Sequence, residues 1–375
     1  MALTKEINRA RWTLELARSS ESEQITDAIQ LSRIVGLLGE GEVGKTETVR
    51  SALGPSLPDN PVIHMDLEGA ASDEHLAFRL VRQVALAELG TEFSTLKVGT
   101  LVPASLERKR VDLANLLTIQ GLEEALRDWP SGELPLAHAL QAVERLARRR
   151  ETILWIDHLE APGLTPRHPL DLDRLLWAIR EMVQTGLHLS VVLSGRDAVE
   201  GRVLGREAAF HQQGQWLSLD NPTDEVWETV ASSLRVPLDL AAELTRLTGG
   251  HPETMLAALA THVETKQASA NQILSDLAST SVPLLNRSVQ HACTLHRLGG
   301  KVLEQIALGH GPYAGSQRGD SPPQEIRKVL GRLQMAGLIR HDRGWSVVNP
   351  SVGILLRREI ATASAPDWGM DELDS

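Results

Sequence analysis

One eight-residue segment constrains the fold of this 375-residue chain more than any other. Residues 39–46 read GEGEVGKT and match the pattern G-x-x-x-x-G-K-[ST] at every fixed position. The segment follows an apolar run, residues 33–38, and opens a helical pattern at Lys45. Glycines let successive backbone N–H groups converge on phosphate oxygens, and a helix start adds a favourable dipole for the anion. Because strand, loop and helix signals coincide, the segment predicts a phosphate-binding loop rather than a chance glycine-rich turn.

The residues of this loop receive separate expected roles. Lys45 is expected to reach the β- and γ-phosphates of a nucleotide. Thr46 is expected to place its hydroxyl on a Mg²⁺ ion that bridges the same phosphates. The other residues expected around the phosphates are Gly39, Gly41, Glu42, Val43, Gly44 and Glu47.

A magnesium site of this kind also needs a carboxylate on a neighbouring strand. Residues 153–157, ILWID, supply four apolar residues followed by an acid. Asp157 is therefore the expected second magnesium-side residue. An ordinary buried strand that ends in a turn aspartate is the alternative, and the complete phosphate loop disfavours it.

Hydrolysis needs a group that orients or activates water, and many ATPases of this class carry a glutamate directly after the strand aspartate. Here His158 occupies that position. The nearest acid is Glu160, which could point toward the γ-phosphate from the turn after the strand, or could be a solvent-exposed loop acid. His158 could polarise water, although a lone histidine beside a motif is more often only a hydrogen-bonding side chain.

Polar residues near the ends of later strands are further candidates. Ser194 and Arg196, in VVLSGR, could sense the γ-phosphate, and a strand end followed by an exposed arginine is a comparable interpretation. Arg202 and Arg206 precede the last strand, where an arginine can reach the nucleotide of a neighbouring subunit. Arg206 is retained as a catalytic candidate, while a solvated helix arginine is the favoured interpretation of both.

Alternating β-rich runs and helical patterns predict an α/β domain with a mainly parallel sheet over residues 33–222. Residues 1–32 form an expected N-terminal helical segment: a helix over Ile7–Leu16, a break at the polar SSESEQ, and a second short helix. Residues 91–150 are interpreted as a helical insertion within the α/β domain. The five expected strands are residues 33–38, 62–67, 152–157, 189–194 and 215–219.

Strand signals stop after Pro222. Helical patterns over residues 223–285, with TGGHP at 248–252, predict a helical lid. Over residues 286–360 the pattern becomes helix, loop, helix, short strand, turn, short strand, which predicts a winged helix. Residues 361–375 form an acidic tail.

Charge is unevenly distributed along the chain. The net charge of −11 disfavours nonspecific nucleic-acid binding by the whole molecule, yet residues 286–360 carry eleven Lys and Arg against five Asp and Glu. A basic helix face there could enter a major groove of duplex DNA, with arginines on the wing reaching the backbone. A charged, solvent-exposed helix face is the somewhat favoured alternative. The candidate DNA-contacting residues are Gln324, Lys328, Arg332, Arg340 and Arg343.

Several classes of protein are disfavoured by composition. No segment approaches the roughly 18 uncharged apolar residues that span a bilayer, and the first residues are charged where a signal peptide is apolar. We therefore expect a cytoplasmic protein without a membrane partner. The single cysteine, Cys293, cannot form an internal disulfide, no Cys/His cluster has zinc-ligand spacing, and Cys293 is expected to be buried.

Together these motifs resemble the STAND branch of the AAA+-related ATPases, within the ASCE class of P-loop NTPases, and in particular archaeal-type ATPases with a C-terminal winged helix. The resemblance covers about residues 30–360 and rests on GEGEVGKT, VIHMDLEG, ILWIDHLE, VVLSGR, WLSLDNPTDE, TGGHP and NPSVGILLRRE. It implies ATP or ADP with Mg²⁺ as ligands, and nucleotide contacts by Gly250, His251 and Pro252. No N-K-x-D guanine motif follows the sheet, which also favours ATP over GTP.

The resemblance further implies a molecular switch that holds ADP when closed, exchanges it for ATP and often oligomerises. Its expected partners are further copies of itself and a separately encoded effector or sensor, in a defence or mobile-element system. Two alternatives stay open. One is a DNA-binding ATPase of the initiator or transposition-regulator type, and the other is a nucleotide-binding scaffold that does not hydrolyse, because His158 replaces the usual acid.

Substitution of the loop lysine tests the phosphate-loop interpretation. Lys45→Ala removes the positive charge from the phosphates, so it is expected to abolish ATP binding while the domain stays folded. Calorimetric titration with ATP measures this effect, and undiminished affinity would contradict the interpretation.

Overall fold

The computed structural model divides into two compact units, which we describe separately. The sheet unit comprises residues 19–39 and 44–219, and the helical unit comprises residues 1–18, 40–43 and 220–375. The structure describes residues 13–15, 18–41, 43–56, 60–68, 76–77, 79–81, 83–84, 87, 136–164, 170–185, 188–280, 282–313, 322–341, 344–350, 352–354 and 356–357.

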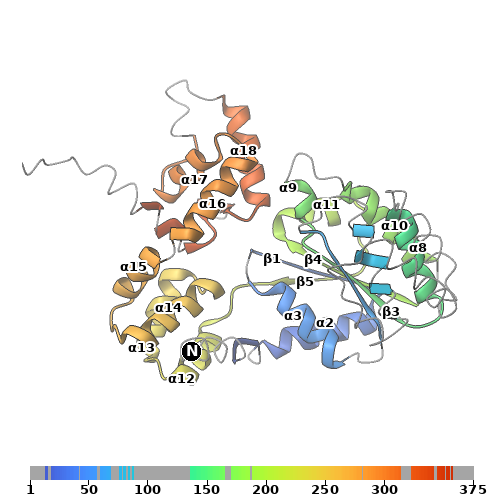
Figure 1. The fold of residues 1–375 in the computed structure, drawn as a ribbon, viewed down its shortest axis with the longest axis horizontal. Helices are drawn as coiled ribbons and strands as arrows, with labels where there is room; N and C mark the ends of the chain where they lie inside the picture. The colour runs from blue at the N-terminus through green and yellow to red at the C-terminus, as the bar shows by residue number, and fades with distance from the viewer. Residues whose placement is uncertain are drawn as a thin grey trace, which may run out of the picture. The chain divides into compact units, whose positions relative to one another are not determined.

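The sheet unit is built on five strands in the order β2-β3-β4-β1-β5, and every neighbouring pair is parallel (Figure 1). All residues of β1 and β3 are buried, as in a parallel sheet covered on both faces. The predicted five-stranded P-loop sheet is therefore confirmed, and β4 lies between β1 and β3. The strands are β1 Ile34–Gly39, β2 Val62–Asp66, β3 Thr152–Asp157, β4 Leu189–Arg196 and β5 Gln215–Leu219.

Helices cover both faces of this sheet. Figure 1 places α2 and α3 together on one side, and α8 and α10 on the other. The apolar residues of α8 and α10 recur at helical spacing and join the main buried cluster of the unit. The helices are α2 Ser19–Leu31, α3 Lys45–Ser56, α8 Leu136–Ala147, α9 Ala161–Leu164, α10 Leu172–Gln184 and α11 Glu200–Leu204, with a 3₁₀ turn η3 at Asp197–Val199.

The N-terminal prediction needs correction. The SSESEQ segment does not break a helix but begins α2 at Ser19, because serine and glutamate are well suited to the first turn of a helix. Helix α2 packs against α3, β1, β4 and β5, so it belongs to the sheet unit rather than to a separate segment 1–32. Of the expected helix over Ile7–Leu16, residues 13–15 are helical and the rest lies outside the described residues.

The expected insertion over residues 91–150 is described from residue 136 onward. There it consists of α8 and the turn before β3, and α8 packs against β3. Residues 91–135 lie outside the described part of the chain.

In the described part of the helical unit, four helices lie over the expected lid, and three helices and a two-stranded antiparallel sheet follow. The lid helices share a buried core that includes Trp227, Leu244 and Met255. The order of the later elements matches the order expected for a winged helix, and that assignment stays a prediction. The elements are α12 Asp224–Leu234, α13 Leu238–Thr248, α14 Pro252–Thr265, α15 Ala270–Thr280, α16 Val282–Leu295, α17 Gly299–Ala307, α18 Pro323–Met335, β6 Ile339–His341 and β7 Trp345–Val347.

Two further sequence expectations concern single features. Cys293 is exposed on α16, so the expectation that it is buried was wrong. Among the helices that the structure describes, none is long and apolar enough to cross a membrane.

Gly36 is a position at which β1 tolerates no side chain. It lies beside Trp216 in the β1–β5 register, and an added Cβ would fall 1.9 Å from Cε3 of the indole. We expect Gly36→Ala to lower the free energy of unfolding by about 1–3 kcal/mol, the usual effect of overpacking.

The matched control is Gly54→Ala in α3, where an added Cβ meets no atom within 4 Å. It is expected to leave stability unchanged or raise it by about 0.5–1 kcal/mol. Urea denaturation compares both variants with the wild type, and equal stability of Gly36→Ala and the wild type would contradict this packing.

Candidate nucleotide-binding site

The predicted loop joins the end of β1 to the start of α3. Strand β1 ends at Gly39 and α3 begins at Lys45, so the predicted strand, loop and helix occur in that order. Gly44 has a φ of 98°, a conformation open to glycine and unfavourable for other residues. Val43 is buried, and Glu42 lies outside the described residues.

Lys45 lies among charged groups. Its Nζ donates a hydrogen bond to the carbonyl oxygen of Gly39 at 3.0 Å. Burial lowers the pKa of Lys45, the negative charge of Glu160 opposes this shift, and the positive charge of Arg196 adds to it. A phosphate held by the loop would favour the charged form of the lysine, so the environment suits an anionic ligand.

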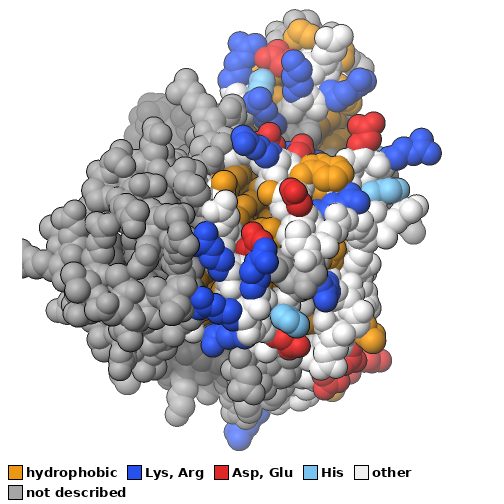
Figure 2. Space-filling view, turned by 90° about the vertical axis from the view of Figure 1, so that its right-hand side faces the viewer, with side chains coloured by type: hydrophobic (Ala, Val, Ile, Leu, Met, Phe, Trp, Pro, Cys, Tyr) orange, Lys and Arg blue, Asp and Glu red, His pale blue; other side chains and the backbone are white. Residues whose placement is uncertain are grey.

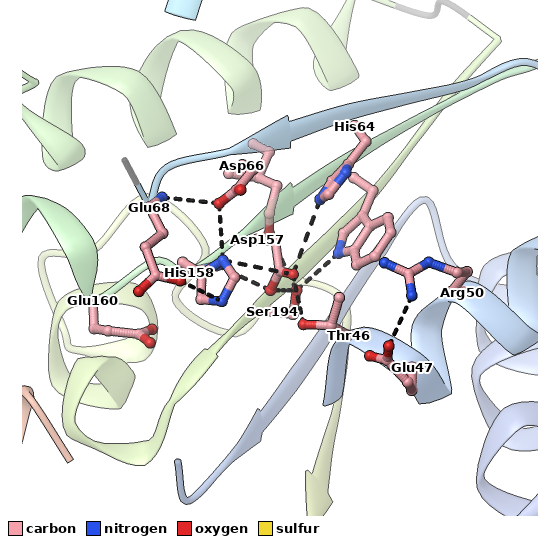
Figure 3. A network of polar contacts seen from close by, with 12 residues as sticks. Thr46, Glu47, Arg50, His64, Asp66, Glu68, Asp157, His158, Glu160 and Ser194 are labelled. Carbon is pink, nitrogen blue, oxygen red and sulfur yellow. Dashed lines mark hydrogen bonds and ion pairs between the residues drawn. The ribbon is translucent and has the colours of Figure 1, made fainter. Parts of the chain in front are cut away.

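Asp157 is the centre of the site (Figure 3). Thr46 Oγ1 donates a hydrogen bond to Asp157 Oδ2 at 2.8 Å, and Ser194 Oγ donates to Oδ1 at 2.6 Å. Trp155 Nε1 in turn donates to Ser194 Oγ at 2.8 Å. Three elements, α3, β3 and β4, therefore meet at one carboxylate that is 1% exposed.

This arrangement fits the expected Mg²⁺. Within the described residues, no group of three or more His, Cys, Asp or Glu side chains could hold a metal by itself. Mg²⁺ in nucleotide sites is bound by one or two protein oxygens, with phosphate oxygens and water completing the octahedron. Thr46 and Asp157 can supply those protein oxygens.

His158 is surrounded by carboxylates. Its Nδ1 lies 2.9 Å from Asp66 Oδ1 and 3.7 Å from Asp157 Oδ2, and its Nε2 lies 3.3 Å from Glu68 Oε2. Burial alone would lower the pKa of His158, but the hydrogen bond with Asp66 and the charges of Asp157, Glu68 and Glu160 outweigh it and raise the pKa to about 9. His158 is therefore a cation at neutral pH, held as a hydrogen-bonding side chain.

Asp66 and Glu68 were missed by the sequence reasoning. Asp66 ends β2 and is paired with Asp157 in the β2–β3 register. The signal was available, because VIHMD ends in an acid just as ILWID does, and the carboxyl ends of parallel strands meet at the same edge of a sheet.

Glu160 and Arg196 form a partly buried ion pair. Glu160 is 4% exposed, and its carboxylate accepts hydrogen bonds from the Arg196 backbone N–H at 3.1 Å and from Nε at 3.0 Å. The alternatives of an exposed loop acid and an exposed arginine were therefore both wrong. Arg196 Nη1 is buried and has no hydrogen-bond acceptor within the described residues, which makes it a donor suited to an anion.

Three other residues of the sheet unit were predicted from the sequence as site residues, and in the structure they are exposed or form ion pairs. Glu47, in the first turn of α3, is exposed and forms an ion pair with Arg50 at 2.8 Å. Arg202 forms an ion pair with Asp173 at 3.2 Å. Arg206 is exposed in the turn after α11, and its role toward a neighbouring subunit stays a prediction.

In the helical unit, Arg18 was not singled out from the sequence. Buried Arg18 donates hydrogen bonds to the carbonyl oxygens of Val43, at 2.5 Å, and Asp220. His251 and Pro252 are buried at the start of α14, and their contact with nucleotide stays a prediction.

The candidate DNA-contacting residues are not equally accessible. Arg332 Nη1 donates to the carbonyl oxygen of Leu295 at 2.7 Å, and Arg340 Nε donates to Ser346 Oγ at 3.2 Å. Gln324 and Lys328, by contrast, are exposed on α18. Arg343 lies outside the described residues.

Comparison with known proteins supports the same fold. No family model and no curated protein matches the sequence. Among solved structures, a Walker-type ATPase of Pyrococcus abyssi is 15% identical, with a TM-score of 0.63 over 91% of this chain and 95% of that chain. The chain has the fold of a P-loop ATPase. The predicted P-loop α/β fold, similar to that of an archaeal ATPase, is thereby confirmed, and the winged helix stays a prediction.

Two further solved structures match this chain with lower TM-scores. The Orc1 protein of Aeropyrum pernix, solved in complex with DNA, is 13% identical over 92% of this chain and 93% of that chain, with a TM-score of 0.44. A STAND protein with a tetratricopeptide repeat sensor from Pyrococcus horikoshii is 15% identical, with a TM-score of 0.39 over 90% of this chain and 42% of that chain. These two scores are too low to support an argument about this protein.

The cationic His158 makes the stability of the metal-free protein depend on pH. The pKa is raised from 6.5 to about 9 on folding, so the folded protein binds this proton more tightly than the unfolded chain. The contribution to stability is complete below about pH 6.5 and is lost as the pH rises through about 9.

We expect the stability advantage of the wild type over His158→Asn to be largest near pH 6 and to shrink toward about pH 9.5. Asparagine is chosen because it tolerates the left-handed φ of 59° at this position. Urea denaturation in EDTA at several pH values measures the difference, and an advantage that stays constant across the range would contradict the assignment.

Proposed function

We propose that this protein is an ATPase that works as a nucleotide-dependent switch. The observation that carries the proposal is the convergence of Thr46, Asp157 and Ser194 beside the loop lysine. A buried carboxylate that meets a hydroxyl at the start of a phosphate-loop helix is suited to holding Mg²⁺ against nucleotide phosphates.

In the proposed mechanism, Lys45 and the backbone N–H groups of the loop bind the β- and γ-phosphates. Thr46 and Asp157 would hold Mg²⁺, which would neutralise charge on those phosphates. Arg196, oriented by Glu160, offers its buried Nη1 to the γ-phosphate. Glu160 is also the proposed water-orienting carboxylate.

We propose that turnover is slow. His158 stands where many ATPases of this class have an acid, and its ring is already engaged by Asp66 and Glu68. Slow hydrolysis suits a switch, because the ATP-bound state then lasts long enough to engage partners. The sequence resemblance to STAND ATPases supports self-assembly on exchange of ADP for ATP, a separately encoded effector or sensor as partner, and a role in a defence or mobile-element system.

Two other functions keep some support. Exposed Gln324 and Lys328 on α18 favour a DNA-binding ATPase, although the hydrogen bonds of Arg332 and Arg340 within the chain reduce the basic surface available for DNA. On the face drawn in Figure 2, Lys and Arg side chains lie among acidic and apolar ones. The engaged ring of His158 favours a nucleotide-binding scaffold that does not hydrolyse.

Measurement of Mg²⁺-dependent phosphate release tests the proposed enzyme. The wild type is expected to release phosphate slowly, and Glu160→Gln to reduce the rate about tenfold or more while its affinity for ADP stays within about twofold. Lys45→Ala is the control that loses binding itself. An unchanged rate in Glu160→Gln would remove the role of Glu160, and a wild type without any release, alone or with partners, would favour the scaffold.

Particle size and DNA affinity separate the switch from the DNA-binding ATPase. Light scattering with ATP is expected to show a larger particle than with ADP. Affinity for duplex DNA at two salt concentrations is expected to be weak and unaffected by Lys328→Glu. Strong, salt-dependent DNA binding that Lys328→Glu abolishes, together with a constant particle size, would overturn the switch in favour of the DNA-binding ATPase.

A further inference from the structure

Strand β2 brings an unexpected polar residue toward the magnesium side of the site. Side chains alternate along a strand, so His64 and Asp66 share one face of β2, and Trp155 and Asp157 share the same face of β3. The register pairs His64 with Trp155 and Asp66 with Asp157. Residues 62, 64 and 66 form the half-buried face of β2, where a polar side chain is ordinary, so what needs an explanation is the direction in which the ring of His64 points.

The imidazole of His64 points toward Asp157, and a dashed line in Figure 3 marks the contact between them. Its Nε2 lies 3.9 Å from Asp157 Oδ2, beyond hydrogen-bond distance. This nitrogen is buried and has no hydrogen-bond partner among the residues that the structure describes. The oxygen that it faces, Oδ2, is the same one that accepts the hydrogen bond from Thr46.

Neighbouring groups hold this ring in place. It stacks on Trp155, with ring centroids 3.9 Å apart and an angle of 17° between the planes. The backbone of His64 is held by Gln83, whose Oε1 accepts from the His64 N–H at 2.5 Å and whose Nε2 donates to the His64 carbonyl oxygen. Because β2 is an edge strand among the strands that the structure describes, this carboxamide occupies hydrogen-bonding positions that a neighbouring strand would use.

His64 Nε2 and Asp157 Oδ2 are too close for a water on the line that joins them, but a water beside them, about 2.8 Å from each, would be within hydrogen-bond distance of both. Mg²⁺ dehydrates reluctantly and keeps several waters in nucleotide sites. A metal-bound water is a strong hydrogen-bond donor. The unprotonated nitrogen of a neutral imidazole and a carboxylate oxygen can both accept from it. Side chains that hold such waters orient the metal ligands and commonly change metal affinity when they are removed.

We infer that His64 is a positioning residue of the magnesium site, whose Nε2 accepts a hydrogen bond from a metal-bound water beside Asp157 Oδ2. The stack on Trp155 aims the nitrogen, and Trp155 is itself connected to Asp157 through Ser194. The inference rests on the proposed nucleotide and magnesium site and adds to it a group from β2 that has no role in binding phosphate.

Calorimetric titration with ADP, in Mg²⁺ and in EDTA, tests the inference on the full-length protein. The measured quantity is the gain in ADP affinity that Mg²⁺ provides. His64→Phe keeps a ring able to stack on Trp155 but removes the nitrogen, so the gain is expected to fall about tenfold, with the EDTA affinity within about twofold of the wild type.

A second pair of variants repeats the comparison without a ring. Glutamine and methionine are similar in size, and only glutamine offers a polar atom at the end of the side chain. His64→Gln is expected to keep more of the Mg²⁺-dependent gain in ADP affinity than His64→Met. This order does not depend on which variant is the more stable.

The outcomes separate this inference from the proposed function. A gain in His64→Phe equal to that of the wild type, or equal gains in His64→Gln and His64→Met, would overturn the inference alone. Equal losses of affinity in Mg²⁺ and in EDTA would also overturn it, because they indicate a purely structural histidine. A wild type that binds no ADP under either condition would overturn the proposed nucleotide site and this inference with it.

Discussion

The carboxylate of Asp157, held by Thr46 and Ser194, is the interaction on which the arrangement of the site depends. An ionised carboxylate that is almost fully buried is costly unless its oxygens accept hydrogen bonds. Here both oxygens do, and the donors come from a helix and from a different strand. The parallel sheet makes this convergence possible, because β1, β3 and β4 all end at the edge where α3 begins.

Around this carboxylate the charges are nearly balanced. Lys45, Arg196 and His158 carry positive charge, and each lies close to at least one acid. The negative charge of Glu160 favours the charged form of Lys45, and Glu160 also forms an ion pair with Arg196. Asp66 forms an ion pair with His158. Such pairing lowers the cost of collecting many charges in a partly buried place. It also leaves His158 engaged rather than available as a base, which connects the absence of the usual acid to the slow turnover proposed for this protein.

Agreement between sequence and structure was best where the signal was local. The loop, all five strands and the partnership of Thr46 with Asp157 followed from motifs that each span only a few residues. Disagreement arose where a polar segment or a single residue was interpreted without its neighbours. The SSESEQ segment begins a helix instead of breaking one, and Cys293 is exposed. For Glu160 and Arg196 the sequence left exposure open as an alternative, and their pairing excludes it.

The sequence by itself determined the phosphate loop, the alternation of strands and helices, and the acid at the end of β3. Each of these depends on glycine conformation, hydrophobic periodicity or helix-start chemistry, which act over short stretches of chain. Only the tertiary structure decided which side chains share the site with that acid. His64 and Asp66 lie about ninety residues before the strand that they face, and the register of β2 against β3 brings them there. Their contribution depends on strand pairing and burial, which no local pattern specifies.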